Sequence, residues 1–137
     1  MRNADLCTED EIRHLVYAFY DRIRSDAILA PVFNAHIAPD EWPAHLNKMV
    51  DFWSSLLLGT ARFSGTPMTR HAALPDISPE HFQHWIALFD ATAATLDNQA
   101  MAERARMMAR RIARSLWLGY QTSNFPDRLA ADLALPA

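Results

Sequence analysis

The amino-acid sequence predicts an all-α fold. Apolar residues recur at steps of three and four positions in several separate segments, which is the period of helices that bury one face. Helix-capping residues and prolines precede these segments, and glycine or asparagine follows two of them. No segment alternates apolar and polar residues as a half-buried strand does. These observations favour helices over any fold built on a β-sheet.

The first helix is expected to begin after Thr8, which forms a capping box with Glu11 three residues later. About four turns follow, and their apolar face consists of Ile12, Leu15, Val16, Phe19 and Ile23. Ser25 or Asp26 then starts a short helix that has Pro31 at the end of its first turn. Its apolar side chains are Ile28, Leu29, Val32 and Phe33.

A long helix is expected from Asp40 to Leu58, and Gly59 is placed to end it. Apolar residues cover more than half of its circumference. Four of its side chains share one face, namely His45, Met49, Phe52 and Leu56. The segment from Gly59 to Ile77 is predicted to be mostly loop around one short helical turn. A loop of this length in a compact domain is usually functional.

The next helix starts at Ser78-Pro79-Glu80, which combines a capping serine, a proline at the first helical position and an acid in the first turn. Its apolar face consists of Phe82, Trp85, Ile86, Phe89, Ala93 and Leu96. Asp97-Asn98 interrupts it, and the last helix is expected from about Gln99 to Gln121. A C-terminal tail over residues 123–137 follows, and from Phe125 onward it is expected to be frayed.

The bulk composition excludes several classes of protein. With 137 residues, the chain is expected to form a single domain over residues 1–137. A net charge of −3 argues against a nucleic-acid partner. No apolar run approaches the roughly 20 residues of a membrane span, and the N-terminus has no secretory signal, so a cytoplasmic location is expected. The single cysteine, Cys7, agrees with a reducing compartment.

The arginine-rich segment from Arg104 to Arg114 allows two interpretations. It resembles a basic amphipathic helix that binds membranes or acidic partners. The alternative, which we favour, is a core-facing stripe with the arginines on the solvated side. That stripe would consist of Met101, Ala105, Met108, Ile112 and Leu116.

His71 lies on a short turn that Pro67 opens and Pro75 closes, with Arg70 beside it. A fixed imidazole with apolar neighbours and a nearby cation suits axial ligation of haem iron. Haem also requires apolar walls, for which the chain offers Phe33, Met49, Phe52, Phe63, Leu74, Phe82 and Met108. Plain core packing is the alternative for these aromatic and aliphatic residues.

Three polar side chains are suited to the opposite face of the iron, where a bound dioxygen gains negative charge and accepts hydrogen bonds. These are the phenol of Tyr20, the imidazole of His45 and the indole of Trp85. The alternative for each is a hydrogen-bonded core residue. His81 and His84 stand three residues apart, but nothing near them completes a zinc site, so capping or surface roles are expected.

The unequal helices and their irregular connections favour globin-like packing over an up-down bundle. From Thr8 to Tyr120 the chain resembles a group III truncated haemoglobin, a two-on-two globin. The resemblance rests on an ordered set of motifs: Phe19-Tyr20; Ile28 to Phe33; Trp42 and His45 before Phe52-Trp53; Leu57-Leu58-Gly59; Phe63 to Pro67 before His71; and His81-Phe82 with Trp85 and Leu88-Phe89.

This resemblance implies a truncated globin-like helical sandwich that encloses haem b. His71 would be the proximal iron ligand, and Tyr20, His45 and Trp85 the distal residues. Phe33 would pack against the haem ring, and Arg70 would be the basic residue before the ligand. Met49, Phe52 and Trp53 match apolar and aromatic positions of the distal helix.

The resemblance leaves the function open between two classes. One is a protein that binds dioxygen, nitric oxide, carbon monoxide or similar small ligands. The other is an enzyme of the nitric oxide dioxygenase or peroxidase type, which would need a separate reductase, because no flavin or nicotinamide domain is apparent. A third class, a haem-free helical interaction protein, has the least support.

Overall fold

The computed structural model describes residues 6–60 and 77–135. In these ranges the chain forms the helices α1 (Glu9–Arg24), α2 (Ala30–Asn34), α3 (Trp42–Leu58), α5 (Pro79–Ala93) and α6 (Gln99–Asn124), with the 3₁₀ helix η2 (Pro39–Glu41) leading into α3. The described ranges contain no strand, so the all-α prediction is confirmed. None of their helices is long and apolar enough to cross a bilayer.

Helix α1 begins as the sequence predicts. The Thr8 hydroxyl accepts a hydrogen bond from the Glu11 N–H at 3.1 Å, and the Glu11 carboxylate accepts one from the Thr8 N–H at 2.9 Å. Two of the otherwise unpaired N–H groups at the helix start are thereby satisfied. The residues of its predicted apolar face, Ile12, Leu15, Val16, Phe19 and Ile23, are all buried.

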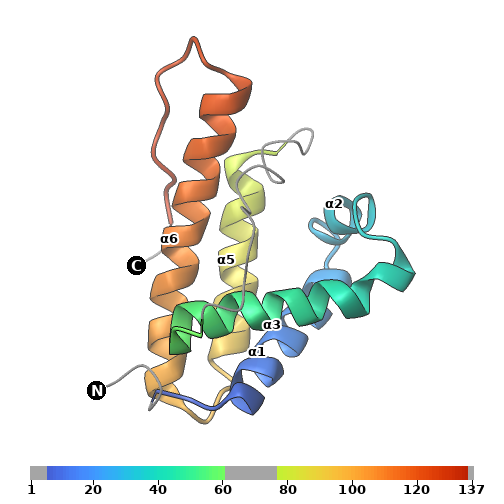
Figure 1. The fold of residues 1–137 in the computed structure, drawn as a ribbon. Coiled ribbons are helices and arrows are strands. Elements are labelled where there is room, and N and C mark those ends of the chain that lie inside the picture. The colour runs from blue at the N-terminus through green and yellow to red at the C-terminus, as the bar shows by residue number, and fades with distance from the viewer. Residues whose placement is uncertain (1–5, 61–76, 136–137) are drawn as a thin grey trace.

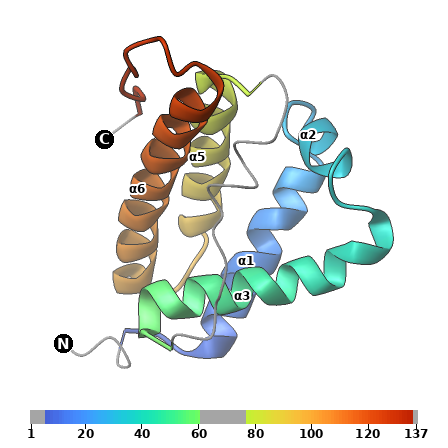
Figure 2. The ribbon, with the colours of Figure 1, turned by 45° about the horizontal axis from the view of Figure 1, so that its top comes forward.

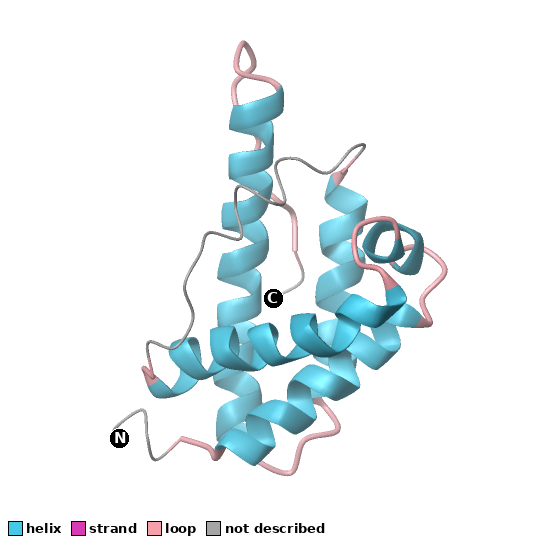
Figure 3. Ribbon diagram, turned by 45° about the vertical axis from the view of Figure 1, so that its right-hand side comes forward, coloured by secondary structure: helices cyan, strands magenta, loops and turns pink. Residues whose placement is uncertain are grey.

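The helices pack in two pairs. Helices α5 and α6 run antiparallel and side by side, and α1 packs mainly against α3 and α5 (Figure 1). The α1 and α3 helices lie across the α5–α6 pair, and α2 sits beyond the C-terminal end of α1 (Figure 2). In the view of Figure 3, α6 also extends past the start of α5. This arrangement leaves α2, α3 and α5 around one end of α1.

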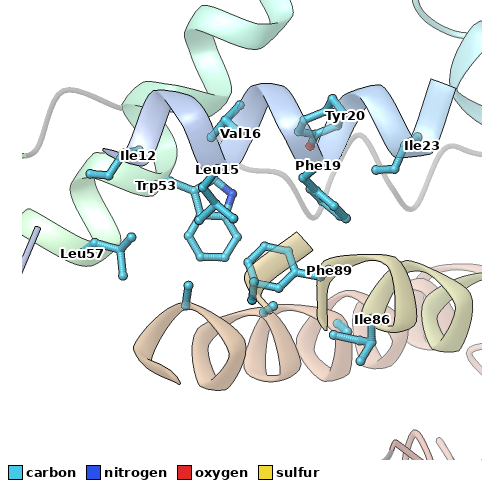
Figure 4. Close-up of a cluster of buried hydrophobic side chains, with 14 of the residues drawn as sticks. Ile12, Leu15, Val16, Phe19, Tyr20, Ile23, Trp53, Leu57, Ile86 and Phe89 are labelled. Atoms are coloured by element: carbon cyan, nitrogen blue, oxygen red, sulfur yellow. The ribbon is translucent and has the colours of Figure 1, made fainter. Parts of the chain in front are cut away.

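The core lies where α1, α3 and α5 meet, as Figure 4 shows for Leu15 and Phe19 of α1, Trp53 of α3 and Phe89 of α5. The Trp53 and Phe89 rings stack with their centroids 5.2 Å apart. Half of the buried apolar residues of helix α6 are small, namely Ala102, Ala105, Ala109 and Ala113, each 0–2% exposed. Small residues on α6 allow the larger side chains of α5 to pack close to its backbone.

Four boundaries differ from the sequence prediction. Helix α3 begins at Trp42, after the 3₁₀ helix η2, and α5 ends at Ala93, before Leu96 of its predicted apolar face. The α-helix that carries Phe33 begins at Ala30, one turn after Asp26. Asp26 still organises that turn, because its carboxylate accepts hydrogen bonds from the N–H groups of Ile28 and Leu29 at 3.0 and 2.9 Å. Helix α6 continues to Asn124, three residues past the predicted end.

The tail from Phe125 to Leu135 is attached to the helices at a few points and so is not simply frayed as expected, although residues 125–132 are exposed. The Gln121 side chain donates to the Ala131 carbonyl and accepts from the Ala131 N–H, both at 2.9 Å. Gln83 of α5 donates to the Ala134 carbonyl at 2.9 Å, and Leu133 is buried. Figure 1 shows this segment turning at the end of α6 and running back beside it. The tail sequence has no helical periodicity, so this packing could not be predicted.

The solvated arginine face of α6 is confirmed for three of the five arginines from Arg104 to Arg114. Arg106 is only partly exposed and donates from Nε to the Asp90 carboxylate at 3.2 Å. Arg104, Arg111 and Arg114 are exposed, whereas Arg110 is only 9% exposed. Arg110 makes a two-pronged bond to Asp90 of α5, with N–O distances of 2.9 and 2.7 Å. The hydrogen bonds from Arg110 hold the pKa of the Asp90 carboxyl below its usual range. This half-buried pair joins α5 to α6.

Arg110→Met is expected to lower the free energy of unfolding by about 1.5–3 kcal/mol, the usual worth of hydrogen bonds to a charged group. The exposed Arg111→Met is the matched control and should change it by less than about 0.5 kcal/mol. Because folding lowers the pKa of Asp90, the pair stabilises the protein at neutral pH. That contribution is lost as the pH falls below about 4. Urea unfolding at several pH values measures both effects, and equal losses in the two variants would contradict the assignment.

Candidate functional site

Four aromatic rings from three elements gather at the end of α1. The Tyr20 ring lies 6.0 Å from Phe33 of α2, 6.0 Å from Trp42 and 5.5 Å from His45 of α3, centroid to centroid. The His45 ring stands perpendicular to both Tyr20 and Trp42. The structure therefore brings together two of the predicted distal residues, Tyr20 and His45, with the predicted ring-packing residue Phe33.

Trp85 of α5 joins this cluster through Phe19. The Phe19 ring makes edge-to-face contacts with Tyr20 at 5.2 Å and with Trp85 at 5.3 Å. Because Phe19 and Tyr20 are consecutive on α1, they point in different directions. Phe19 turns toward Phe89, at a centroid distance of 4.9 Å, and Tyr20 faces the α2–α3 side (Figure 4). Helix α1 thus positions both the ring that contacts α5 and the ring that contacts α2 and α3.

Two hydrogen-bond donors in this cluster have no acceptor within the part of the chain that the structure describes. Tyr20 is 6% exposed, and within residues 6–60 and 77–135 its hydroxyl makes no hydrogen bond. The indole N–H of Trp85, which is partly buried, likewise makes none with the described residues. Burial raises the pKa of Tyr20 well above its usual value, so the phenol keeps its proton and can donate it in a hydrogen bond. A donor that has no protein partner at such a position is free to bind a ligand or a water molecule.

The predicted apolar walls divide into two groups. Phe33, Met49, Phe52 and Met108 pack on the edge of the core and remain partly exposed. These four side chains come from α2, α3 and α6, so they present apolar surface from three elements. Phe82 is 8% exposed and packs against Trp117 of α6. The first group leaves apolar surface that a flat cofactor would cover.

Trp53, also predicted to contact a cofactor, is 2% exposed and lies inside the core. Its ring packs on Phe52 at 5.9 Å and stacks on Phe89 at 5.2 Å. Its neighbours in Figure 4 include Leu15 of α1. A contact between Trp53 and haem stays a prediction.

Four of the predicted site residues lie outside the described part of the chain. These are Phe63, Arg70, His71 and Leu74. The proximal side of the predicted haem site therefore rests on the sequence, whereas the distal side can be followed in the structure.

The two histidines considered for zinc have other partners. His81 accepts a hydrogen bond from the Ser78 N–H at 3.1 Å and so caps the start of α5. His84 binds Asp26 at 2.7 Å. The described residues contain no group of three or more histidine, cysteine or acidic side chains arranged for a metal. His81 thus has one of the two roles expected from the sequence, whereas the partly buried contact of His84 with Asp26 is neither a cap nor a surface role.

Sequence reasoning missed two members of the cluster. Trp42 is 2% exposed and contacts Tyr20, Phe33 and His45. Its position three residues before His45, on the same helix face, was the available signal. Phe19 was expected only as core, and its contact with Trp85 joins residues that are 66 positions apart in the sequence (85 − 19). No local pattern reveals such a contact.

The chain is similar to known globins over most of its length. Residues 5–116 match the model of the family described as "Bacterial-like globin". The "Group 3 truncated hemoglobin ctb" of Campylobacter jejuni is 34% identical over 107 residues, which cover 74% of this chain and 84% of that protein. The crystal structure of group III truncated hemoglobin from the same organism superposes with a TM-score of 0.76 at 30% identity, covering 85% of this chain and 92% of that one. The chain therefore belongs to the bacterial-like globin family, among the group III truncated haemoglobins.

Proposed function

We propose that this haem-binding globin holds haem b with His71 as the axial ligand and binds dioxygen and other diatomic gases beside Tyr20, His45 and Trp85. The observation that carries the proposal is Tyr20, whose ring is buried among aromatic side chains and whose hydroxyl makes no hydrogen bond with the described residues. The family membership supports the cofactor.

The energetic argument concerns the donors on the distal side. A protein hydrogen bond contributes about 0.5–1.5 kcal/mol, which is lost when one of its groups turns to a ligand instead. Because the Tyr20 hydroxyl makes no hydrogen bond with the described residues, it can donate to a small acceptor without that cost. Dioxygen accepts hydrogen bonds well once it carries negative charge, whereas carbon monoxide is a poorer acceptor. The distal side is thus suited to retain dioxygen selectively.

Haem supplies an iron atom with one open coordination position for the gas. The remaining roles fall to the protein. Phe33, Met49, Phe52, Phe82 and Met108, with Phe63 and Leu74, would exclude water from the ring faces. Arg70 would pair with a carboxylate at the ring edge. Trp85 would donate its indole N–H or provide a wall.

Several donors around one ligand slow its release, which suits reaction more than transport. We therefore include turnover of the nitric oxide dioxygenase or peroxidase type, with a separate reductase, as a second proposed function. The Tyr20 donor again favours it, because it steadies a reactive oxygen ligand. A binding or sensing role requires only the first proposal. Membership of the globin family argues against a haem-free interaction protein.

The test of this proposal starts with the visible spectrum of the purified protein after titration with haem. We expect saturable one-to-one binding, and a further spectral change when the reduced protein meets dioxygen or carbon monoxide. A protein that binds neither haem nor gas would overturn the proposal. Consumption of nitric oxide in the presence of dioxygen and a reductant then separates an enzyme from a binding protein.

A further inference from the structure

A hydrogen-bonded histidine–aspartate pair lies next to the distal cluster and joins two segments far apart in the sequence. His84 of α5 and Asp26, in the turn between α1 and α2, lie 2.7 Å apart from Nε2 to Oδ1. Their side chains are 32% and 16% exposed, so the contact is only partly shielded from bulk water. Such charge-assisted bonds are shorter and stronger than neutral ones.

The Asp26 carboxylate uses both of its oxygen atoms. Oδ1 accepts from His84, while Oδ2 accepts from the N–H groups of Ile28 and Leu29 at 3.0 and 2.9 Å. Burial raises the pKa of this carboxyl, but the bonds from His84 and the two amides more than offset it and keep the pKa below its usual range. The carboxylate is therefore ionised and accepts from both sides, and His84 Nε2 carries the donated proton.

Both partners are connected to side chains of the proposed ligand pocket. On one side, the Leu29 carbonyl accepts a hydrogen bond from the Phe33 N–H at 3.1 Å, so the Asp26 turn leads directly to Phe33. On the other side, His84 immediately precedes Trp85 on α5. The main packing partner of α2 is α1. The histidine–aspartate pair thus adds a direct bond from the α1–α2 turn to α5.

We infer that Asp26 and His84 form a latch that holds the α1–α2 turn against α5 and positions Phe33 and Trp85 at the entrance of the ligand pocket. Only the effect of the latch on ligand entry rests on the proposed function. The latch itself consists of hydrogen bonds between protein groups and does not require haem. With the latch closed, Phe33 and Trp85 keep a fixed separation. With the latch broken, the turn moves more freely and small ligands enter faster.

The first experiment measures hydrogen exchange of the Ile28 and Leu29 amides by NMR in the protein without haem. His84→Ala should speed their exchange by roughly tenfold, because loss of a charge-assisted bond lowers the cost of local opening. His84→Gln, which keeps a side-chain N–H donor, should restore most of the protection. Gln83→Ala is the matched control, because Gln83 precedes His84 on α5 but donates its hydrogen bond to the C-terminal tail and not to the α1–α2 turn.

The second experiment measures carbon monoxide binding after flash photolysis of the haem-loaded protein. His84→Ala and Asp26→Asn should both raise the bimolecular association rate severalfold. The first change removes the donor of the His84–Asp26 hydrogen bond, and the second removes the charge of its acceptor. Gln83→Ala should leave the rate unchanged.

Unchanged amide exchange in His84→Ala would overturn the latch. Faster exchange with an unchanged association rate would overturn its role in ligand entry. If the wild-type protein binds no haem, the proposed function fails, while the exchange experiment still decides whether the latch exists.

Discussion

Replacing His71 with alanine is expected to abolish stable haem binding, or to leave binding that added imidazole restores. The reason is that the family resemblance assigns His71, in the segment between Pro67 and Pro75, as the proximal ligand. Haem iron without its axial nitrogen is held by apolar contacts and edge charges alone. Titration with haem, with and without imidazole, measures the effect directly.

The described structure leaves few substitutes for His71. His45 lies in the aromatic cluster beside Tyr20, His81 caps α5, and His84 is bonded to Asp26. His14→Ala is the matched control, because His14 is exposed on α1. We expect this control to bind haem as the wild type does. Wild-type haem content in His71→Ala without imidazole would show that another residue ligates the iron.

The helical part of the fold could be predicted because local chemistry determines it. The Thr8–Glu11 capping box, the glycine after Leu58 and Pro79 after a capping serine each act within one turn of chain, and each helix begins or ends there. The exceptions depend on contacts between distant segments. The last turn of α6 and the tail after it are held by bonds such as those from Gln121 to Ala131, which no periodicity indicates.

The candidate site shows the same division. Tyr20, His45 and Trp85 could be selected because polar groups on apolar helix faces are rare enough to notice in a sequence. Trp42 and Phe19 join the site only through ring contacts across helices. The role of Asp26 depends on a partner 58 residues away (84 − 26), so sequence reasoning assigned it only to a helix start.

Tyr20→Phe is expected to speed dioxygen release by about ten- to a hundredfold. The loss of a hydrogen bond to a charged acceptor costs roughly 1.5–3 kcal/mol, and about 1.4 kcal/mol is a factor of ten. The change should not unfold the protein, because the Tyr20 hydroxyl makes no hydrogen bond with the described residues and its ring contacts are kept by phenylalanine. An unchanged or slightly higher free energy of unfolding is the control.

Carbon monoxide separates a donor role for Tyr20 from a purely steric one. Because carbon monoxide accepts hydrogen bonds poorly, its release from Tyr20→Phe should change much less than that of dioxygen. Trp85→Phe extends the comparison: it should act in the same direction as Tyr20→Phe where the indole N–H reaches the ligand, and have little effect where the ring is only a wall. Stopped-flow measurement of both gases gives the answer. Equal changes for the two gases in Tyr20→Phe, or no change for either, would contradict the donor role. Tyr20 would then act only through the packing of its ring against Phe33 and Trp42.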